Sequence, residues 1–367
     1  MTASRAVSVS VGLLMVLVLV VLLGVTQVYE RRVEQQAIGH LKTMLMLRES
    51  VLRSYFESLR SEVTLWSNRP VVIDLMGSLQ ATHQARGTEG LAEIGKTHLV
   101  EDPESGTRNR ESTTLDARIA AFAEHHGYYD VFFIDPDGNV LYTIAREDDY
   151  GSNLLNGPYA DTALGRLFRH LNASPGGDGV EFEDFSLYLP SNNQPAAFLG
   201  ARVRSEGSYL GVYAFQIPDD EVNEIMQFSA GMGETGETYL VGEDGLMRSQ
   251  SRFLAGSSVL NTKVTGATVG KALSGEIGLE IVDDYRGVPV YSAYRLFEFE
   301  SIRWAVLAEQ DVAEVKAPIY SMRLWMGGGF LILCLIALLL YFMLPRMVLP
   351  TSIAAFLGIS LLQMDDD

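Results

Sequence analysis

Two long apolar stretches without a charged residue lie near the two ends of the chain. Residues 7–25 (VSVSVGLLMVLVLVVLLGV) and 324–344 (LWMGGGFLILCLIALLLYFML) are each close to the ~20 residues that a helix needs to cross a bilayer. The first could also be a cleaved signal peptide, but it is long for that role and no small-residue cleavage site follows Leu23. The second could be a buried core helix, which its chargeless length disfavours. We therefore predict two transmembrane helices.

Residues 27–67 have the spacing of one long helix that continues the first apolar stretch. Apolar residues recur at intervals of three, four and seven, and charged residues fill the other positions. No proline interrupts the pattern until Asn68-Arg69-Pro70, which is a stop signal. At 1.5 Å per residue such a helix would be roughly 60 Å long. The predicted apolar stripe consists of Leu41, Leu45, Leu52, Phe56, Leu59 and Val63.

The next segment mixes helix and loop signals. Residues 71–84 are typical of a second, shorter helix, and residues 115–126 (LDARIAAFAEHH) are typical of a third. Between them, residues 86–113 are polar and interrupted by Gly and Pro, so we predict that this segment is partly loop.

One sequence pattern occurs twice in the remainder of the region between the two apolar stretches. FFIDPDGNVLYT, residues 132–143, and YLVGEDGLMRSQ, residues 239–250, each contain an apolar run, an acidic turn and a second run. Each centres on an Asp-Gly dipeptide, a strong hairpin signal because Gly accepts positive φ at no steric cost. The two predicted turns are Asp137-Gly138 and Asp244-Gly245.

The surroundings of this pattern also repeat. Residues 209–226 and residues 303–320 each read as a strand, a few acids and a helix. The segments PAAFLGARV and VPVYSAYRL precede them and read as their partner strands. The chain is therefore predicted to be α+β, with two tandem copies of one unit.

The charge of the chain bears on its possible partners, and its cysteine content bears on how the region between the two stretches is stabilised. The net charge of −18 disfavours nucleic acid and an anionic membrane surface as partners, although it also serves solubility. The one cysteine, Cys334, lies in the second apolar stretch, so the region between the stretches must fold without a disulfide.

The sequence between the two stretches resembles the double-Cache sensor region of bacterial transmembrane receptors. These include methyl-accepting chemotaxis proteins, sensor kinases and membrane nucleotide cyclases. The resemblance covers about residues 27–322 and rests on GYYDVFFIDPDGNVLYT, NLLNGPYADT, DFSLYLPSNNQPAAF and GETGETYLVGEDGLMRSQSR. It implies two PAS-like units on the long helix, a ligand in the membrane-distal unit and transmission through the proximal unit.

The amino-acid-binding branch of this family is matched only in part. In LNGPYADT, Tyr159 fits the second aromatic of the branch, but Asn156 stands at the position of its arginine and Pro158 at that of its first aromatic. Gln216 replaces the aspartate that would hold an α-ammonium. A carboxylate favours the fork of Arg and an ammonium favours a carboxylate, so we predict that the ligand is not an ordinary α-amino acid.

At the candidate pocket positions the chain has aromatic and amide side chains in place of charged ones, and these suit a small neutral or weakly polar molecule. Each could instead be a core or loop-capping residue. The predicted ligand-binding residues are Tyr129, Asn153, Asn156, Tyr159, Phe185, Tyr188 and Gln216.

No metal, cofactor or catalytic residue is predicted. Asp135, Asp137 and Asn139 resemble the start of a calcium loop, but Gly138 comes one position early and Arg146 stands where a bidentate acid is needed. The chain shows no convincing set of nucleophile, base and oxyanion donors and no phosphate loop, so we expect no enzyme activity.

The expected function is that of a receptor sensor in the bacterial inner membrane, with residues 27–322 on the outside. We expect a parallel homodimer, because of the stripe on residues 41–63 and the glycines that open the second stretch. LPTSIAAFLGISL, near the C-terminus, resembles the opening of a HAMP linker. We expect a cytoplasmic output domain or partner outside this chain: either the output domain has been lost or replaced, or the protein is a stand-alone membrane partner. An extracytoplasmic enzyme has little support.

These inferences divide the chain into six parts. They are an N-terminal tail and first span at 1–26, the long helix at 27–67, a membrane-distal unit at 68–227, a membrane-proximal unit at 228–322, the second span at 323–345 and a cytoplasmic tail at 346–367.

Overall fold

The computed structural model describes residues 2–97, 99–100, 113–174, 177 and 179–361. The chain forms two units, which we describe separately. The helical unit comprises residues 1–39 and 312–367, and the sheet unit comprises residues 40–311.

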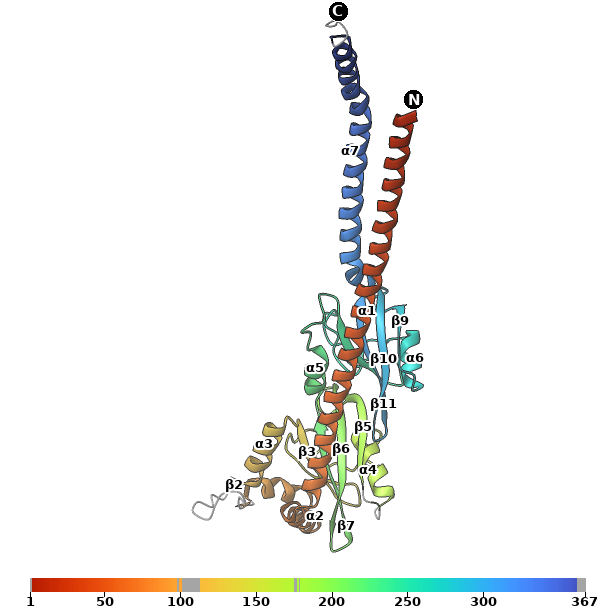
Figure 1. The fold of residues 1–367 in the computed structure, drawn as a ribbon. Coiled ribbons are helices and arrows are strands. Elements are labelled where there is room, and N and C mark those ends of the chain that lie inside the picture. Colours follow the sequence, from red (N-terminus) through yellow and green to blue (C-terminus); the bar gives the residue numbers. More distant parts are fainter. Residues whose placement is uncertain (1, 98, 101–112, 175–176, 178, 362–367) are drawn as a thin grey trace, which may run out of the picture. The chain divides into compact units, whose positions relative to one another are not determined.

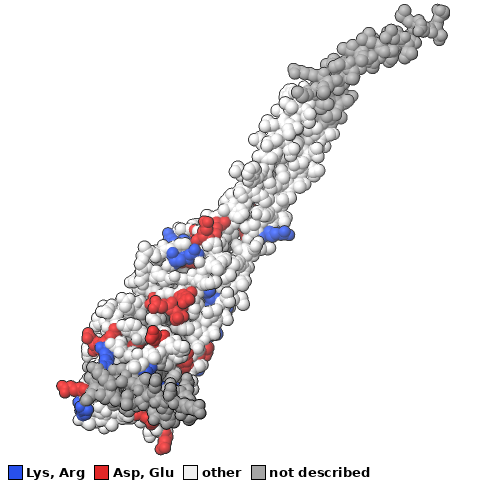
Figure 2. Space-filling model, turned by 90° about the vertical axis from the view of Figure 1, so that its left-hand side faces the viewer, with Lys and Arg blue, Asp and Glu red and all other residues white. Residues whose placement is uncertain are grey.

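The helical unit consists of the first part of α1 (Thr2–Ser67) and of α7 (Val312–Leu361). Both helices are long and apolar enough to cross a membrane, and the predicted spans lie within them. On the face seen in Figure 2, their apolar stretches carry no Lys, Arg, Asp or Glu. Next to these stretches, Glu30 pairs with Arg323 at 2.6 Å and Glu34 with Lys316 at 3.5 Å. α7 continues through Pro345, and the end of the second span at residue 345 stays a prediction.

In the sheet unit, α1 presents the predicted apolar stripe to its own chain. All six stripe residues are buried. Phe56 lies at the centre of an aromatic cluster, with ring centroids 5.3 Å from Phe182, 5.7 Å from Phe297 and 5.5 Å from Trp304. Because these rings come from both sheets of the unit, this one helix holds both sheets (Figure 1).

The helix after α1 is longer than predicted. α2 (Pro70–Thr97) bends at Gly87, whose φ of 61° and extended ψ interrupt the helical geometry. Glycine permits this conformation at no steric cost, so the helix resumes beyond the bend and residues 88–97 are not the loop we expected. The predicted loop at 101–112 lies outside the described residues. α3 (Leu115–His126) matches its prediction, and β1 (Leu99–Val100) pairs with β2 (Thr113–Thr114).

The first sheet is antiparallel and has the strand order β4-β3-β7-β6-β5. α4 (Ala163–Ala173) connects β4 to β5 and packs on the sheet, where Leu167 and Leu171 approach Gly200. The strands are β3 (Asp130–Ile134), β4 (Val140–Thr143), β5 (Val180–Tyr188), β6 (Gln194–Ser205) and β7 (Ser208–Ile217).

The second sheet has the strand order β8-β11-β10-β9. A short bridge between Val241 and Met247 extends it beyond β8. Its elements are α5 (Asp220–Gln227), which precedes it, β8 (Glu237–Val241), α6 (Ala267–Leu273), β9 (Gly278–Asp283), β10 (Pro289–Phe299) and β11 (Ile302–Asp311).

The two sheets repeat one design, which confirms the predicted α+β fold with two copies of one unit. Their strands follow the same order, with β3, β7, β6 and β5 corresponding to β8, β11, β10 and β9. The turns also agree: Gly138 N donates to Asp135 O and Gly245 N to Gly242 O, both at 3.0 Å. The two Asp-Gly turns therefore occupy equivalent places in separate sheets (Figure 1).

The two faces of the first sheet have different neighbours. Phe132, Ile134 and Phe198 belong to a core cluster that also includes α4 residues such as Leu167. On the opposite face, the ring of Phe215 stacks on Tyr128, with centroids 4.1 Å apart. Since side chains alternate along a strand, Asp130 and Gln216 point to the same face as the core cluster.

Gly211 in β7 provides a stability prediction. A Cβ at this residue would lie 2.1 Å from the backbone oxygen of Ile134 in the neighbouring strand, and its φ is 135°. Gly211→Ala must therefore shift β3 against β7 and should lower the free energy of unfolding by about 2 kcal/mol, measured by urea denaturation. Gly207→Ala is the control, because Gly207 also has positive φ but no atom within 4 Å of the Cβ position. Equal losses in both variants would contradict the clash.

Candidate functional site

The candidate site begins where β3 and β7 lie side by side. Asp130 opens β3 and is the register partner of Gln216 near the end of β7. Residues directly opposite in an antiparallel pair project to the same face. The loop after β4, residues 144–162, and the turn between β5 and β6 supply the other polar groups.

Asp130 ties this loop to the sheet. It is fully buried, and its Oδ1 accepts hydrogen bonds from the backbone N–H of Val131 at 2.7 Å, Ile144 at 2.7 Å and Ala145 at 3.2 Å. Its Oδ2 accepts a hydrogen bond from the hydroxyl of Thr143. Burial raises the pKa of Asp130 to about 6, although these hydrogen bonds oppose the shift. Its role is to fix the start of the loop.

Asp149 is the second buried carboxylate. None of its surface is exposed, its Oδ2 accepts a hydrogen bond from the Tyr188 hydroxyl, and its Oδ1 has no partner among the described residues. Burial raises its pKa to about 7, and the charges of Asp130 and Glu147 add to the shift. The carboxyl group therefore lies close to both of these acids and has one free acceptor.

A hydrogen-bonded chain joins the loop to the sheet. Glu147 accepts from the Tyr129 hydroxyl at 2.7 Å and from Ser191 Oγ at 2.6 Å. Ser191 Oγ in turn accepts from Gln216 Nε2 at 3.0 Å. Gln216 is only 3% exposed, and its Oε1 has no hydrogen-bond partner within the described part of the chain.

These groups form what we call the acid cluster, defined as Asp130, Glu147 and Asp149. No Lys, Arg or His of the described residues forms an ion pair with any of the three within 4.0 Å. By contrast, Asp184 pairs with Arg248 and Asp284 with Arg286, whereas the buried Glu237 and Glu309 have, like the acid cluster, no ion pair among the described residues. The acid cluster thus combines two buried carboxylates, the half-buried Glu147 and one unused acceptor, Asp149 Oδ1.

The structure brings three of the predicted site residues together at the acid cluster: Tyr129, Tyr188 and Gln216. Tyr159 is half-buried and packs against the core cluster on the same face of the sheet.

The other three predicted residues lie elsewhere. Asn153 uses its side chain within the loop, donating to Asp137 O at 2.9 Å and accepting from the N–H of Asn156 at 3.0 Å. Asn156 itself is exposed. Phe185 stacks on Trp304, with centroids 6.1 Å apart, and so faces the second sheet instead of the acid cluster.

The sequence analysis missed four residues of the site: Asp130, Glu147, Asp149 and Ser191. Asp130 had a usable signal, because it shares a strand face with Phe132 and Ile134 and an acid at a core-facing position requires an explanation. The other three lie in polar loop segments where nothing in the local pattern marks burial.

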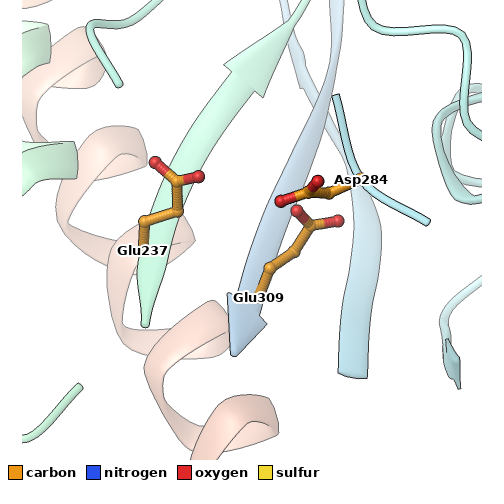
Figure 3. A group of neighbouring side chains, drawn as sticks. All are labelled: Glu237, Asp284 and Glu309. Atoms are coloured by element: carbon orange, nitrogen blue, oxygen red, sulfur yellow. The ribbon is translucent and has the colours of Figure 1, made fainter. Parts of the chain in front are cut away.

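A second group of acids lies in the second sheet. One carboxylate oxygen of each of Glu237, Asp284 and Glu309 lies within 4.8 Å of the others (Figure 3). Glu237 accepts from Ser251 at 3.1 Å, Glu309 from Tyr239 at 2.9 Å, and Asp284 pairs with Arg286 at 2.6 Å. Oxygen ligands suit a hard divalent cation, but these hydrogen bonds already account for the carboxylates, and we assign no metal to them.

The two sheets meet at a buried arginine. Arg248, which follows β8, donates from Nε to Asp184 Oδ2 of β5 at 3.0 Å and from Nη2 to Asp244 Oδ2 at 2.9 Å. Trp304 Nε1 of β11 donates to Asp184 Oδ1 at 3.0 Å. Asp184 thus receives donors from two elements of the second sheet, beside an open cleft of about 320 Å³.

Comparison with known proteins assigns this architecture. Residues 29–319 match the family model dCache_1, described as Cache domain. No curated protein matches the chain. Among solved structures, the chain is similar to an extracellular domain assigned to the histidine kinase vpHK1S-Z8, with 9% identity, 78% of this chain and 95% of that chain covered, and a TM-score of 0.51.

Two further solved structures are also similar to this chain, to different degrees. A domain assigned to a sensory box/GGDEF family protein from Vibrio parahaemolyticus has 10% identity, covers 77% of this chain and 99% of its own, and has a TM-score of 0.50. The ligand-binding domain of the Pseudomonas aeruginosa PAO1 amino-acid chemoreceptor PctC, in complex with GABA, has 15% identity, coverages of 70% and 99%, and a TM-score of 0.37.

Proposed function

The chain belongs to the Cache-domain family, and on this basis we propose that residues 27–322 sense a small molecule outside a bacterial cell and signal through the cell membrane. Domains of this kind are extracellular ligand-binding sensor domains of transmembrane receptors. The two apolar helices on either side of the domain are suited to anchor it. The proposed role is binding and transmission without catalysis.

The observation that carries the proposal is the pair of unused buried acceptors at the first sheet. A buried polar atom without a hydrogen bond costs about 1–3 kcal/mol. Asp149 Oδ1 and Gln216 Oε1 both lack a partner within the described residues. Glu147 relates the two groups, because its charge acts on Asp149 and its carboxylate accepts from Ser191, the hydrogen-bond partner of Gln216. A bound molecule with hydrogen-bond donors would satisfy them.

Transmission is proposed to use the contacts between the two sheets. Asp184 of the first sheet is held by Arg248 and Trp304, and Trp304 lies on β11. α7 begins at Val312, directly after the last residue of β11. Helix shifts of about 1–2 Å are a known switching mode, and they require a ligand that binds the two states with different affinities.

Thermal unfolding of the full chain in lipid nanodiscs tests ligand binding. We expect at least one class of small molecule, cationic, neutral or anionic, to raise the unfolding temperature of the wild-type protein. Ser191→Ala should weaken this effect about tenfold in ligand concentration, because it breaks the chain between Glu147 and Gln216. Ser186→Ala, elsewhere in the first sheet, is the control. If no class of molecule stabilises the wild-type protein, the proposal is wrong.

We propose a parallel homodimer as the working assembly. The stripe on residues 41–63, on which the expectation rested, is buried within its own chain and is therefore not available to a partner. Leu47 and Val51 remain exposed one turn apart on α1. With Cys334→Ser as background, Leu47→Cys and Val51→Cys should crosslink between copies in membranes, whereas the exposed Ser61→Cys should not. Absence of crosslinks at both positions would argue against this interface.

A further inference from the structure

The charge at the acid cluster is not balanced by an ion pair with any Lys, Arg or His that the structure describes. Its three carboxylates come from β3 and the loop after β4, and none is ion-paired with a described residue. Removing a carboxylate from water is costly unless a cation or several donors compensate. Asp130 has four donors, but Asp149 has one, from Tyr188.

The orientation of Gln216 follows from its neighbour. The single hydroxyl proton of Ser191 is donated to Glu147, so Ser191 Oγ can only accept from Gln216. The amide must therefore turn its NH₂ group toward Ser191, which leaves Oε1 as an acceptor. Both unused groups, Asp149 Oδ1 and Gln216 Oε1, thus require a donor and offer none.

The position also disfavours an anionic group. Asn156 stands where the amino-acid-binding branch would carry its arginine, and its side chain is exposed. The nearest basic residue in sequence is Arg146, whose guanidinium lies 6.0 Å from the ring of Tyr150. A carboxylate placed beside Asp149 would meet the like charges of Asp130 and Glu147, neither of which is ion-paired with a described residue.

We propose that the acid cluster binds the positively charged amino group of an organic amine that carries no carboxylate beside it, with Asp149 as counter-charge and Gln216 Oε1 as second acceptor. This inference rests on the proposed function and names the ligand class of that same site. An ammonium offers up to three N–H donors and a full positive charge, which the two unused acceptors and the charge of the cluster require. The neutral ligand expected from the aromatic and amide residues alone is replaced by a cation.

The test uses the full chain in nanodiscs and isothermal titration calorimetry with a matched panel. Butylamine, ethanolamine and putrescine are the cationic probes, 1-butanol is the neutral probe, butyrate the anionic probe and GABA the zwitterionic probe. At least one amine should bind at pH 8, and at least tenfold more tightly than the other three probes. If none of the three amines binds, or if GABA binds as tightly as the best amine, the inference is overturned.

Asp149→Asn removes the charge and keeps the size of the side chain. Amine affinity should fall at least 30-fold, whereas Asp148→Asn, which removes the neighbouring exposed acid, should change it less than threefold. Gln216→Glu adds a carboxylate at the second acceptor and should tighten amine binding at least threefold. This variant keeps the inference testable if Asp149→Asn does not fold.

The pH dependence provides an independent reading. The groups that face Asp149 are Asp130 from β3, Glu147 from its own loop and Tyr188 from β5. With a pKa of about 7 for Asp149, its ionised form rises about tenfold between pH 6 and pH 8, and amine affinity should rise by the same factor. Affinity that is independent of pH in this range would contradict Asp149 as the counter-charge.

Two outcomes would overturn the amine site without contradicting the proposed sensor function. Binding of 1-butanol or another neutral molecule that survives Asp149→Asn would leave the proposed sensor function intact and overturn the amine site. Stabilisation by sodium, potassium, magnesium or calcium chloride that disappears in Asp149→Asn, without amine binding, would assign the cluster to an inorganic cation and likewise overturn it.

Discussion

Arg248→Met should lower the free energy of unfolding by about 3 kcal/mol. The Arg248 side chain is 5% exposed and bridges Asp184 of the first sheet and Asp244 of the second. Breaking a buried ion pair typically costs 3–5 kcal/mol, since the remaining charge stays uncompensated. We expect the lower end of this energy range, because the Asp184 side chain is 30% exposed and keeps its hydrogen bond from Trp304. Urea denaturation of the full chain would measure the loss.

The control for this prediction is Arg303→Met. Arg303 also pairs with two acids, Glu243 and Glu298, but its side chain is 41% exposed, so its removal should cost below about 1 kcal/mol. In Arg248→Met/Asp184→Leu no unpaired charge remains, and part of the stability should return. A loss in Arg248→Met no larger than in Arg303→Met would show that the contact between the sheets does not depend on this arginine.

Glu309→Gln should stabilise the protein at pH 8, by about 2–3 kcal/mol. Glu309 is buried, and burial raises its pKa to about 7, with further contributions from the charges of Glu237 and Asp284. Its folded pKa therefore lies above its unfolded value near 4.5. The stability that the group contributes is fully present below pH 4.5 and is lost as pH rises to 7. Glutamine keeps an acceptor for Tyr239 without becoming charged.

Unfolding temperatures measured from pH 4.5 to pH 8 test this prediction. Wild-type stability should fall across the range, and Glu309→Gln should fall less, so that the two proteins differ most at pH 8. Glu276→Gln, at an exposed acid, should follow the wild-type curve. Asp130 and Asp149 have pKa values of about 6 and 7, so they also lower the stability as pH rises. The stability of Glu309→Gln should therefore still fall with pH, but less than that of the wild-type protein. Parallel curves for wild type and Glu309→Gln would contradict the buried charge.

Local periodicity was enough to predict the elements. The apolar stripe from Leu41 to Val63 is buried at every predicted position, and the two Asp-Gly turns lie in equivalent hairpins of separate sheets. These features repeat within a few residues, so the sequence displays them directly. The end of the second helix was wrong, because Gly87 bends α2 and the helix resumes instead of stopping.

The placement of Phe185 depended on a break in strand alternation. β5 shifts register between Glu183 and Ser186, so Phe182 and Tyr188 contact different clusters although an even spacing separates them. A bulge inserts one residue and reverses the faces beyond it. Phe185 therefore contacts Trp304 in the second sheet, as Phe182 does, although an odd spacing separates Phe182 from Phe185.

The sequence by itself determined the α+β class, the long helix, the duplicated unit and the two apolar helices, because each follows from the spacing of apolar residues along a short stretch of chain. Only the tertiary structure decided the chemistry of the site. Asp130, Asp149, Ser191 and Gln216 come from two strands, a loop and a turn, and they meet only when the sheet closes. Whether an acid is buried, and whether a cation accompanies it, depends on residues far away in sequence, and no local pattern records that.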